Sequence, residues 1–506
     1  MRSLAVLLLL SACATAPVPP AAPAEPVIAI VGPVVIDGSG APAFVTTAVL
    51  IRGDRIDAVG PRSIPAGATI VDGHGLTLAP GFIDMHNHSG RGLERDPSAT
   101  SQVSQGITTL ALGQDGGSEL PIADYLGKLE AAPVAVNVLT FVGQATVRDL
   151  AMKGDLGRAA TPGEIAAMVG TVDQAMRDGA FGLSTGLEYE AAKESSTEEI
   201  IALARATAPY GGIYISHVRD EAQRTFPSFE EALRIGREAK VPVQISHIKM
   251  GSKSVWGRAG DAVRLIENAR AAGQDVTADA YPYDAWHATI RVLVPSGRHD
   301  DPKDVAEAID ENGGADRITI VNCSAHPGYE FKTLEQIAAE QHTTPVDVYM
   351  QVVRDGGATV IGQSMKEEDI RVFYSQPWVM VGSDGGIGLR HPRGAGTYPR
   401  ILGRYVRELH WLPLEEAIRK MTSLPAARLR LTDRGLVKAG MKADLVLFDP
   451  SRVIDQSTFQ DPQRLAQGIE RVFVNGVEVW RDGAVTAAKP GRPIRIQDAR
   501  GRSEPR

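Results

Sequence analysis

The stretch Pro80-Gly-Phe-Ile-Asp-Met-His86-Asn-His88 decides the fold prediction. Its apolar run from Phe82 to Met85 predicts a buried strand, which ends in two imidazoles one residue apart. Side chains at positions i and i+2 of a strand point to the same face, so His86 and His88 can converge on one point. Two neutral imidazoles aimed at one point suit a divalent transition metal, although a single His-x-His also occurs as two polar residues at a strand end.

Beyond this strand, short apolar runs alternate with segments of helical periodicity, a pattern typical of strand–helix units in a parallel sheet. One such segment, Thr161–Asp178, starts with threonine, proline and a glutamate at the third helical position, which predicts a capped helix start. Eight units predict an α/β fold, a (β/α)8 TIM-like barrel over residues 80–430 with an insertion at about 285–378. The strands are expected at residues 82–88, 107–112, 134–141, 180–185, 212–217, 241–247, 275–279 and 379–384.

Short strands separated by turn signals are expected on both sides of the barrel. They occupy residues 27–79 and return in residues 431–487, where Asn475-Gly476 predicts a tight hairpin turn. We expect these two segments to pack together as one small β-sandwich beside the barrel. Residues 488–506 are rich in Pro, Gly and Arg, which predicts a disordered tail.

The chain begins with a segment typical of export. A positive charge precedes the apolar run Leu4–Leu10, which is too short to span a bilayer. The following Leu10-Ser-Ala-Cys13 resembles the lipobox of bacterial lipoproteins, which implies a signal peptide and tether over residues 1–26 and lipidation of Cys13. Because Ala14 rather than aspartate follows, the same resemblance implies a lipid anchor in the outer membrane, on its periplasmic side. A plain secretory peptide is the alternative, and either one predicts a protein of the bacterial cell envelope.

Composition argues against two further classes of protein. The net charge is −8 and no basic run occurs, so we expect no nucleic-acid partner. The two cysteines are too few for a disulfide framework.

The expected carboxyl ends of the strands carry side chains with reactive groups, and in a barrel these ends share one rim. The first strand supplies His86 and His88, and the second leads into Gln114-Asp115-Gly116. Each histidine taken alone is more often a structural residue, but their joint placement predicts a metal site. Further candidates at the other ends are Glu188, His217, His247 and Asp384.

These residues, in this order, resemble the amidohydrolase superfamily, and the flanking sequence is similar to the N-acyl-D-amino-acid deacylases, or D-aminoacylases. The resemblance covers residues 27–487 and implies a metal-dependent hydrolase that cleaves the amide bond of small N-acyl-D-amino acids. The motifs that carry it are Gly81-Phe-Ile-Asp-Met-His-Asn-His88, Gly182-Leu-Ser-Thr-Gly-Leu187, Ser216-His-Val-Arg-Asp-Glu221, Ser246-His-Ile-Lys249, Asp279-Ala-Tyr-Pro-Tyr283, Ser383-Asp-Gly385 and His391-Pro-Arg393.

The resemblance also implies a ligand set for one or two divalent ions, with zinc expected: His86, His88, His217, His247 and Asp384. Family members carry a metal-ligating cysteine after the second strand, but this chain has Asp115 at that position. Glu188 follows the fourth strand, where other amidohydrolases place a bridging carboxylate. We expect Glu188 to be the bridge, with Asp115 as the alternative. Oxygen in place of sulfur favours harder metals.

The resemblance assigns roles to the remaining candidates. Asp384 would take a proton from the attacking water and pass it to the leaving amine. The α-carboxylate of the substrate would be held by Lys249, Tyr281 or Tyr283, and Arg393, whose guanidinium can bind a carboxylate bidentately. The insertion resembles the mobile lid that such enzymes place over their site.

Two other functions remain possible at this point. A dipeptidase or a cyclic-amide hydrolase, similar to dihydroorotase or hydantoinase, would use the same scaffold. A non-catalytic exported lipoprotein that binds a ligand would be expected to lack the base or a metal ligand, whereas this chain has Asp384 and the full histidine set.

Overall fold

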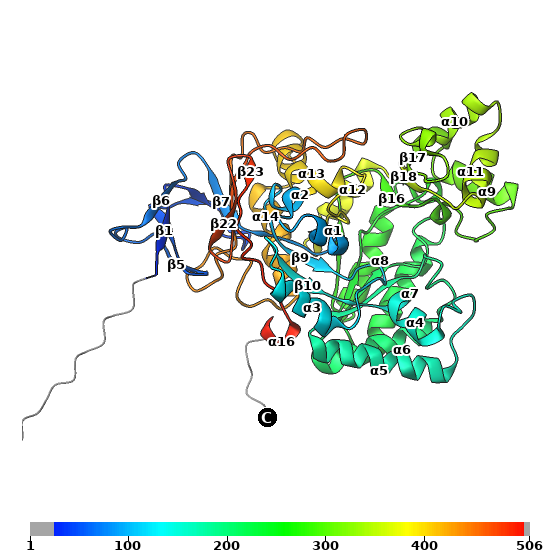
Figure 1. Cartoon of the computed structure of the whole chain (residues 1–506), viewed down its shortest axis with the longest axis horizontal. Helices are drawn as coiled ribbons and strands as arrows, with labels where there is room; N and C mark the ends of the chain where they lie inside the picture. Colours follow the sequence, from blue (N-terminus) through cyan, green and yellow to red (C-terminus); the bar gives the residue numbers. More distant parts are fainter. Residues whose placement is uncertain (1–24, 500–506) are drawn as a thin grey trace, which may run out of the picture.

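A computed structural model of the chain describes residues 25–499. The predicted signal peptide and the lipidation site at Cys13 lie outside the described residues. Figure 1 shows strands from both ends of the chain on one side, a parallel α/β region in the middle, and an insertion that projects from the far side.

The middle region is built on parallel strands in two hydrogen-bonded sets. Their orders are β10-β9-β8 and β11-β12-β13-β14-β15-β19. A parallel bridge between Asn87 and Gly385 links the chain after β8 to the chain after β19, and one residue, Phe141, separates β10 from β11. The strands are β8 (Phe82–Asp84), β9 (Ile107–Leu112), β10 (Asn137–Thr140), β11 (Val142–Gly143), β12 (Gly182–Gly186), β13 (Ile213–His217), β14 (Val243–Ile245), β15 (Val276–Ala280) and β19 (Val379–Val381).

All eight strands predicted from the apolar runs are present, with ends that differ by up to four residues. Every residue of β8, β9 and β12 is buried, as expected where both faces of a parallel sheet are covered. The predicted cap at Thr161 is confirmed, because its hydroxyl accepts from the Glu164 N–H while the Glu164 carboxylate accepts from the Thr161 N–H. The surrounding helices include α4 (Gln144–Met152), α5 (Pro162–Asp178), α6 (Thr197–Thr207), α7 (Thr225–Ala239), α8 (Ala259–Ala271) and α12 (Glu367–Tyr374).

Strands from both ends of the chain form two further sheets. One has the order β5-β4-β1-β6, and the other has the order β23-β22-β21-β20-β7-β2-β3. Strand β20 pairs antiparallel with β7, with Leu445 opposite Pro80, so the two ends of the chain share a sheet. Side chains from both sheets, among them Val49 and Phe473, meet in one buried cluster. The principal strands are β1 (Val27–Val31), β4 (Ala48–Arg52), β5 (Arg55–Val59), β6 (Thr69–Asp72), β7 (Thr77–Pro80), β20 (Leu445–Phe448), β21 (Ile469–Val474) and β22 (Val477–Arg481).

Strand β7 leads directly into β8, the strand that precedes the two histidines. Gly81 lies between them, and its N–H donates to the carbonyl of Asp444 at 2.8 Å. A Cβ atom at Gly81 would lie 2.3 Å from the side chain of Thr108, so this close approach requires glycine. The flanking sheet therefore helps to set the position from which His86 and His88 project.

The insertion is narrower than predicted. Strands β16 (Trp286–Thr289), β17 (Ile318–Asn322) and β18 (Thr359–Gly362) form a separate sheet. With helices α9 (Pro302–Glu311), α10 (Leu334–Gln341) and α11 (Pro345–Arg354) they enclose their own hydrophobic core. Helix α12, which the prediction included in the insertion, packs instead against α8 and β15 of the middle region. Its buried Ile370, Phe373 and Tyr374 belong to the main core, which explains this boundary.

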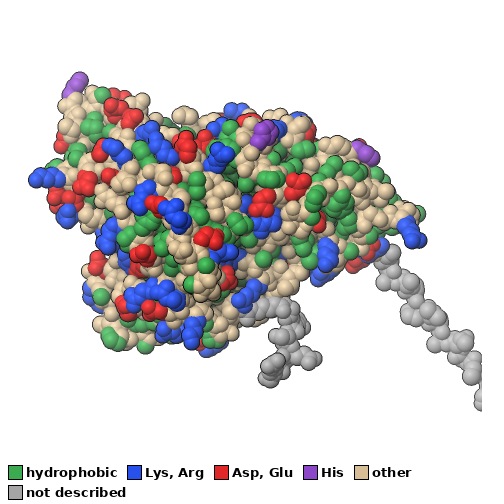
Figure 2. Space-filling model, turned by 180° about the vertical axis from the view of Figure 1, so that it is seen from behind, with side chains coloured by type: hydrophobic (Ala, Val, Ile, Leu, Met, Phe, Trp, Pro, Cys, Tyr) green, Lys and Arg blue, Asp and Glu red, His purple; other side chains and the backbone are tan. Residues whose placement is uncertain are grey.

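Residues 488–499 differ from the expected disordered tail. Pro493 forms a parallel bridge with Val138 of β10, and Ile494 and Ile496 are buried. The backbone N–H groups of Gly491 and Ile494 donate to the carbonyls of Val134 and Val138, which holds this segment against the sheet. Between residues 25 and 499, no helix is both long and apolar enough to cross a membrane. On the face shown in Figure 2, basic and acidic side chains are interspersed.

Candidate metal centre

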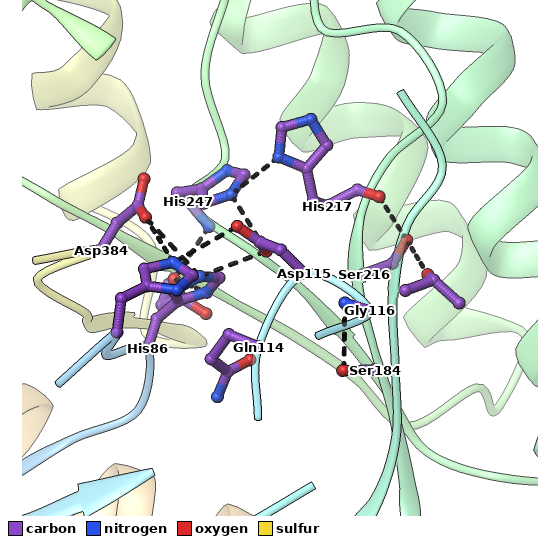
Figure 3. A network of polar contacts seen from close by, with 12 residues as sticks. His86, Gln114, Asp115, Gly116, Ser184, Ser216, His217, His247 and Asp384 are labelled. Carbon is purple, nitrogen blue, oxygen red and sulfur yellow. Dashed lines mark hydrogen bonds and ion pairs between the residues drawn. The ribbon is translucent and has the colours of Figure 1, made fainter. Parts of the chain in front are cut away.

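Four predicted side chains from four different strand ends meet at one point. His86, Asp115, His247 and Asp384 each offer a ligand atom, and these atoms lie within 4.8 Å of one another (Figure 3). Nε2 of His86 is 3.3 Å from Oδ1 of Asp115 and 3.7 Å from Oδ1 of Asp384. Nε2 of His247 is 3.7 Å from Oδ1 of Asp115. The strands thus bring together a group whose members are 29 to 298 residues apart in sequence.

The spacing and the chemistry of these groups fit a divalent metal. A tetrahedral zinc site with bonds of about 2.0–2.1 Å places neighbouring ligand atoms roughly 3.3 Å apart, close to the distances found here. Both ring nitrogens of His86 and Oδ1 of Asp115 are buried and have no hydrogen-bond partner among residues 25–499. Buried polar atoms are normally satisfied, so the unpartnered Nε2 of His86 and Oδ1 of Asp115, which lie 3.3 Å apart, indicate a site for a cation.

The backbone is strained at three of these four residues. Asp115, His247 and Asp384 have φ values of 54°, 32° and 47°, in the left-handed region that residues other than glycine seldom occupy. Such conformations cost about 1–3 kcal/mol each and persist where the surrounding structure enforces them. Their concentration at one cluster supports a functional role for the cluster.

His88 joins the same group from the solvent side. Its Nε2 lies 3.1 Å from Oδ1 of Asp384 and 3.4 Å from Oδ2 of Asp115, and its side chain is 35% exposed. Burial opposes the charged form of this imidazole, but the two carboxylates raise the pKa of His88 to about 9. The two carboxylates therefore place a strong negative potential at this point, as a cation site requires.

His217 completes the arrangement on the other side. Its Nδ1 lies 3.1 Å from Nε2 of His247, which leaves these two nitrogens facing one position. Asp115 lies between His247 and His86, and its Oδ1 is 3.7 Å from the first and 3.3 Å from the second (Figure 3). His247 thus belongs to the four-residue group and also faces His217, so it connects the two parts of the cluster.

Glu188, the expected bridge, is not in this central position. Its Oε2 accepts a 2.8 Å hydrogen bond from the opposite ring nitrogen, Nε2, of His217. The position between the histidines belongs to Asp115, the alternative ligand. The reason is the path of the chain, because Asp115 follows β9, which pairs directly with β8, while Glu188 follows β12 on the far side of His217.

A second acidic residue holds the outer side of His247. Oε1 of Glu221 lies 3.0 Å from Nδ1 of His247, and Oε2 of Glu221 accepts from Nζ of Lys249 at 2.6 Å. A carboxylate this close to Nδ1 favours a proton on that nitrogen, which leaves the lone pair of Nε2 toward the cluster. His217, Glu221 and His247 also form a possible ligand group by distance, but Lys249 Nζ already lies 2.8 Å from Nδ1 of His247. We therefore treat Glu221 as a residue that positions His247.

Two fully buried aspartates position the ligands through the backbone. Asp84 accepts from the backbone N–H and hydroxyl of Ser383 at 2.8 and 2.5 Å, which joins β8 to the segment that carries Asp384. Asp279 Oδ1 accepts from the backbone N–H of His247 at 2.8 Å. Burial raises the pKa of the Asp84 carboxyl. Neither aspartate was predicted as part of the site, although both lie within the motifs Gly81–His88 and Asp279–Tyr283.

The four residues expected to bind substrate are distributed unevenly. Arg393 is buried, and its Nη1 lies 2.8 Å from Oδ2 of Asp384. This contact is not aligned as a hydrogen bond, and neither Nε nor Nη1 of Arg393 donates to another residue between 25 and 499. Burial would raise the pKa of the Asp384 carboxyl, yet the guanidinium and His247 hold it well below its usual range. Arg393 is therefore placed both to keep Asp384 ionised and to receive an anion.

Of the other three, Tyr281 lies near the centre and Tyr283 lies away from it. The guanidinium of Arg393 lies 4.8 Å from the ring centre of Tyr281, whose hydroxyl is buried. Burial raises the pKa of Tyr281 to about 12, so this hydroxyl remains a donor. The Tyr283 hydroxyl donates to Asp455 at 3.1 Å, and Lys249 is engaged with Glu221. Arg393 and Tyr281 thus have the freest polar groups of the four.

A cavity opens over the cluster. It is bounded by the ligands on one side and by the insertion on the other, and its lining includes His217, His247, Asp384, Arg393, Trp286 and Leu293. A small molecule in this cavity would contact both the candidate metal centre and the insertion.

Comparison with known proteins agrees with this geometry. Residues 69–487 match the model of the amidohydrolase family. A D-aminoacylase of Alcaligenes xylosoxydans xylosoxydans is 40% identical, over 92% of this chain and 96% of that protein. An N-acyl-D-aspartate deacylase and an N-acyl-D-glutamate deacylase of the same organism are 37% and 34% identical, over 94% and 92% of this chain and 97% and 96% of those proteins.

Solved structures show the same similarity. A D-aminoacylase structure that concerns a binuclear metal centre has a TM-score of 0.84 at 39% identity, with 94% of this chain and all of that chain covered. The N-acyl-D-glutamate deacylase of Bordetella bronchiseptica, complexed with zinc and a phosphonate inhibitor, has a TM-score of 0.85 at 32% identity with the same coverage. With these matches and the converging ligands, the chain belongs to the amidohydrolase family and, within it, to the D-aminoacylases.

Proposed function

We propose that this protein is a metal-dependent hydrolase that cleaves the amide bond of N-acyl-D-amino acids and releases a carboxylate and a free D-amino acid. The observation that carries the proposal is the convergence of His86, Asp115, His247 and Asp384 with orphaned buried ligand atoms. The activities named for the similar proteins support the substrate class.

We propose one or two divalent ions, with zinc as the expected metal. His86, His88 and Asp384 would hold one position, His217 and His247 the other, and Asp115 would contact both. A bound ion of this kind lowers the pKa of water and polarises a carbonyl. The ligand set has no sulfur, because Asp115 stands where the similar enzymes are expected to have cysteine.

The proton transfer is assigned to Asp384. Its carboxylate is ionised beside Arg393 and faces the cluster, so it can accept a proton from the attacking water. The same carboxyl can then donate this proton to the nitrogen of the leaving amine. Arg393, with free donor groups, would bind the α-carboxylate, and Tyr281 would donate to it from the same side. Lys249 has a smaller role than expected, because Glu221 already engages it.

The architecture supports a closed arrangement of the middle region. We propose that the two parallel sets form one (β/α)8 barrel over about residues 80–430, closed by the bridge between Asn87 and Gly385. We also propose that the flanking sheets form a β-sandwich, which their shared cluster of buried side chains supports. Export as a lipoprotein anchored through Cys13 in the outer membrane remains a proposal based on the sequence.

The function is tested with a panel of substrates on zinc-loaded protein. N-acetyl-D-leucine, N-acetyl-L-leucine, a dipeptide and a hydantoin are supplied at equal concentration, and free amine or ring-opened product is quantified. We expect turnover of the D-acyl compound above all others, and its loss in His88→Ala. Turnover of the dipeptide or hydantoin alone would assign the protein to another hydrolase class, and no turnover of any compound would refute hydrolysis.

A further inference from the structure

The overall identities of 34–40% do not separate the three similar enzymes, which are named as a D-aminoacylase, an N-acyl-D-aspartate deacylase and an N-acyl-D-glutamate deacylase. The residues that line the cavity give a basis for distinguishing these substrate classes. We infer that it takes substrates with a single carboxylate and rejects a second one, whether on the amino-acid side chain or on the acyl group. This inference rests on the proposed function, since it concerns the same site.

The positive charges that line the cavity already have acidic partners. Nζ of Lys249 lies 2.6 Å from Glu221, and the guanidinium of Arg298 lies 2.6 Å from Asp304. Arg393 lies 2.8 Å from Asp384 and is the cation assigned to the α-carboxylate. Among the described lining residues, no lysine or arginine remains to pair with a second carboxylate.

Two cations close to the cavity are also engaged. Lys193 and Arg291 line a neighbouring cavity, which shares Val292, Val294 and Pro295 with the main one. Nζ of Lys193 donates to the carbonyl of Pro295 at 2.8 Å, and Arg291 lies 3.5 Å from Glu190. Neither side chain lines the main cavity, so neither faces the position of a second carboxylate there.

One face of helix α9 makes the far wall of the cavity negative. Asp304, Glu307 and Glu311 follow a spacing of three and four residues, so they lie on one face, and all three line the cavity. Asp304 is paired with Arg298, so the net negative charge of this face comes from Glu307 and Glu311. Val305 and Ile309, on the other face, are buried in the core of the insertion. The helix is thus held with its acidic face toward the substrate.

The wall between α9 and the metal centre is apolar. Val292, Leu293, Val294 and Pro295 line it in sequence, together with Ala288. An amino-acid side chain or acyl group of the substrate that extends from the metal centre in this direction first contacts apolar side chains and then the carboxylates of α9. Burying a carboxylate against hydrocarbon without a partner is unfavourable, and the like charges on α9 add repulsion.

The charges around the cavity therefore favour substrates whose side chain and acyl group are uncharged. Repulsion between two like charges about 6 Å apart, in an effective dielectric of about 20, lowers kcat/KM on the order of 100-fold. We expect at least this discrimination between a neutral substrate and its charged isostere.

Matched substrate pairs test the inference on zinc-loaded full-length protein. The values of kcat/KM are measured for N-acetyl-D-glutamine against N-acetyl-D-glutamate, and for N-succinyl-D-leucine against the corresponding succinamic amide. We expect the neutral member to be preferred by about 100-fold or more in each pair. Ratios near one, or a preference for the acid, would overturn the inference while leaving the proposed function intact. Absence of turnover for these compounds and for N-acetyl-D-leucine would instead refute the proposed function.

Charge reversal on α9 tests the physical cause. Glu307→Lys and Glu311→Lys should each reduce the preference for N-acetyl-D-glutamine over N-acetyl-D-glutamate by about 10-fold or more, since each replaces repulsion by attraction. Asp310→Lys makes the same charge change on the same helix, but Asp310 does not line the cavity and should leave the ratio unchanged. Glu307→Gln provides a milder variant if the lysine variants fold poorly. Equal ratios in all four variants and the wild type would rule out α9 as the source of discrimination.

Discussion

Oδ1 of Asp115 lies 3.3 Å from Nε2 of His86, and Oδ2 of the same carboxylate lies 3.4 Å from His88. The carboxylate thus faces both histidines of the first strand, and its Oδ1 also lies 3.7 Å from His247. A side chain in this position joins the two halves of the ligand set.

Asp115→Ala should therefore remove metal. We expect the bound metal per protein to fall by at least one equivalent under mild chelation, because the shared ligand is lost. Asp115→Cys should restore binding and, with cobalt, add a thiolate-to-metal charge-transfer band. Metal analysis and absorption spectroscopy are the measurements, with the exposed Asp124→Ala on α3 (Ile122–Ala131) as control. Full metal content in Asp115→Ala would contradict this role.

Glu221→Gln should weaken metal binding without removing a ligand. The amide cannot accept the His247 proton as strongly as the carboxylate, so the ring is held less firmly in the required tautomer. We expect affinity to fall about 10- to 100-fold, measured by competition with a chelator. The exposed Glu194→Gln is the matched control, and an unchanged affinity in Glu221→Gln would disprove the positioning role.

Asp384→Asn should separate chemistry from binding. Loss of the proton acceptor is expected to lower kcat about 100- to 10,000-fold for N-acetyl-D-leucine. Titration with a competitive inhibitor should show much smaller changes in affinity, provided that metal analysis finds the site loaded. Retention of wild-type kcat in the loaded variant would assign the proton transfer to another residue.

Arg393→Lys should affect substrate binding even though the charge is kept. A guanidinium can hold a carboxylate through two parallel hydrogen bonds, which an ammonium cannot. We expect KM for N-acetyl-D-leucine to rise about 10-fold or more, while the amide of the same compound, which lacks the carboxylate, should be little affected. An equal change for both compounds would indicate a structural effect instead.

His287 should make the metal-free protein sensitive to acid. Burial, followed by the charge of Arg393, lowers the pKa of His287 to about 3, whereas an unfolded chain binds the proton near 6.5. Between these values the unfolded state binds more protons than the folded state, so the free energy of unfolding falls as the pH falls. From pH 6.5 to 4.5 this loss is roughly 2–3 kcal/mol.

His287→Gln should make that decline shallower, as measured by urea unfolding at several pH values. His342→Gln, at an exposed histidine, serves as the control. Identical pH dependence in wild type and His287→Gln would show that this imidazole does not contribute.

The sequence by itself determined the strands of the middle region and the residues at their carboxyl ends. Buried parallel strands need continuous apolar runs, and a strand places alternate side chains on one face, so His86, His88, His217, His247 and Asp384 could be selected from local pattern and resemblance. Turn chemistry at Asn475-Gly476 and the cap at Thr161 were equally local.

Tertiary structure alone decided which carboxylate lies between the histidines, how far the insertion extends and whether the tail is ordered. Asp115 and Glu188 are both acids just past strand ends, and the order of the strands places one beside His86 and the other behind His217. Helix α12 and residues 488–499 are assigned by what they bury, against strands distant in sequence. Such contacts depend on the three-dimensional path of the chain, which no local pattern records.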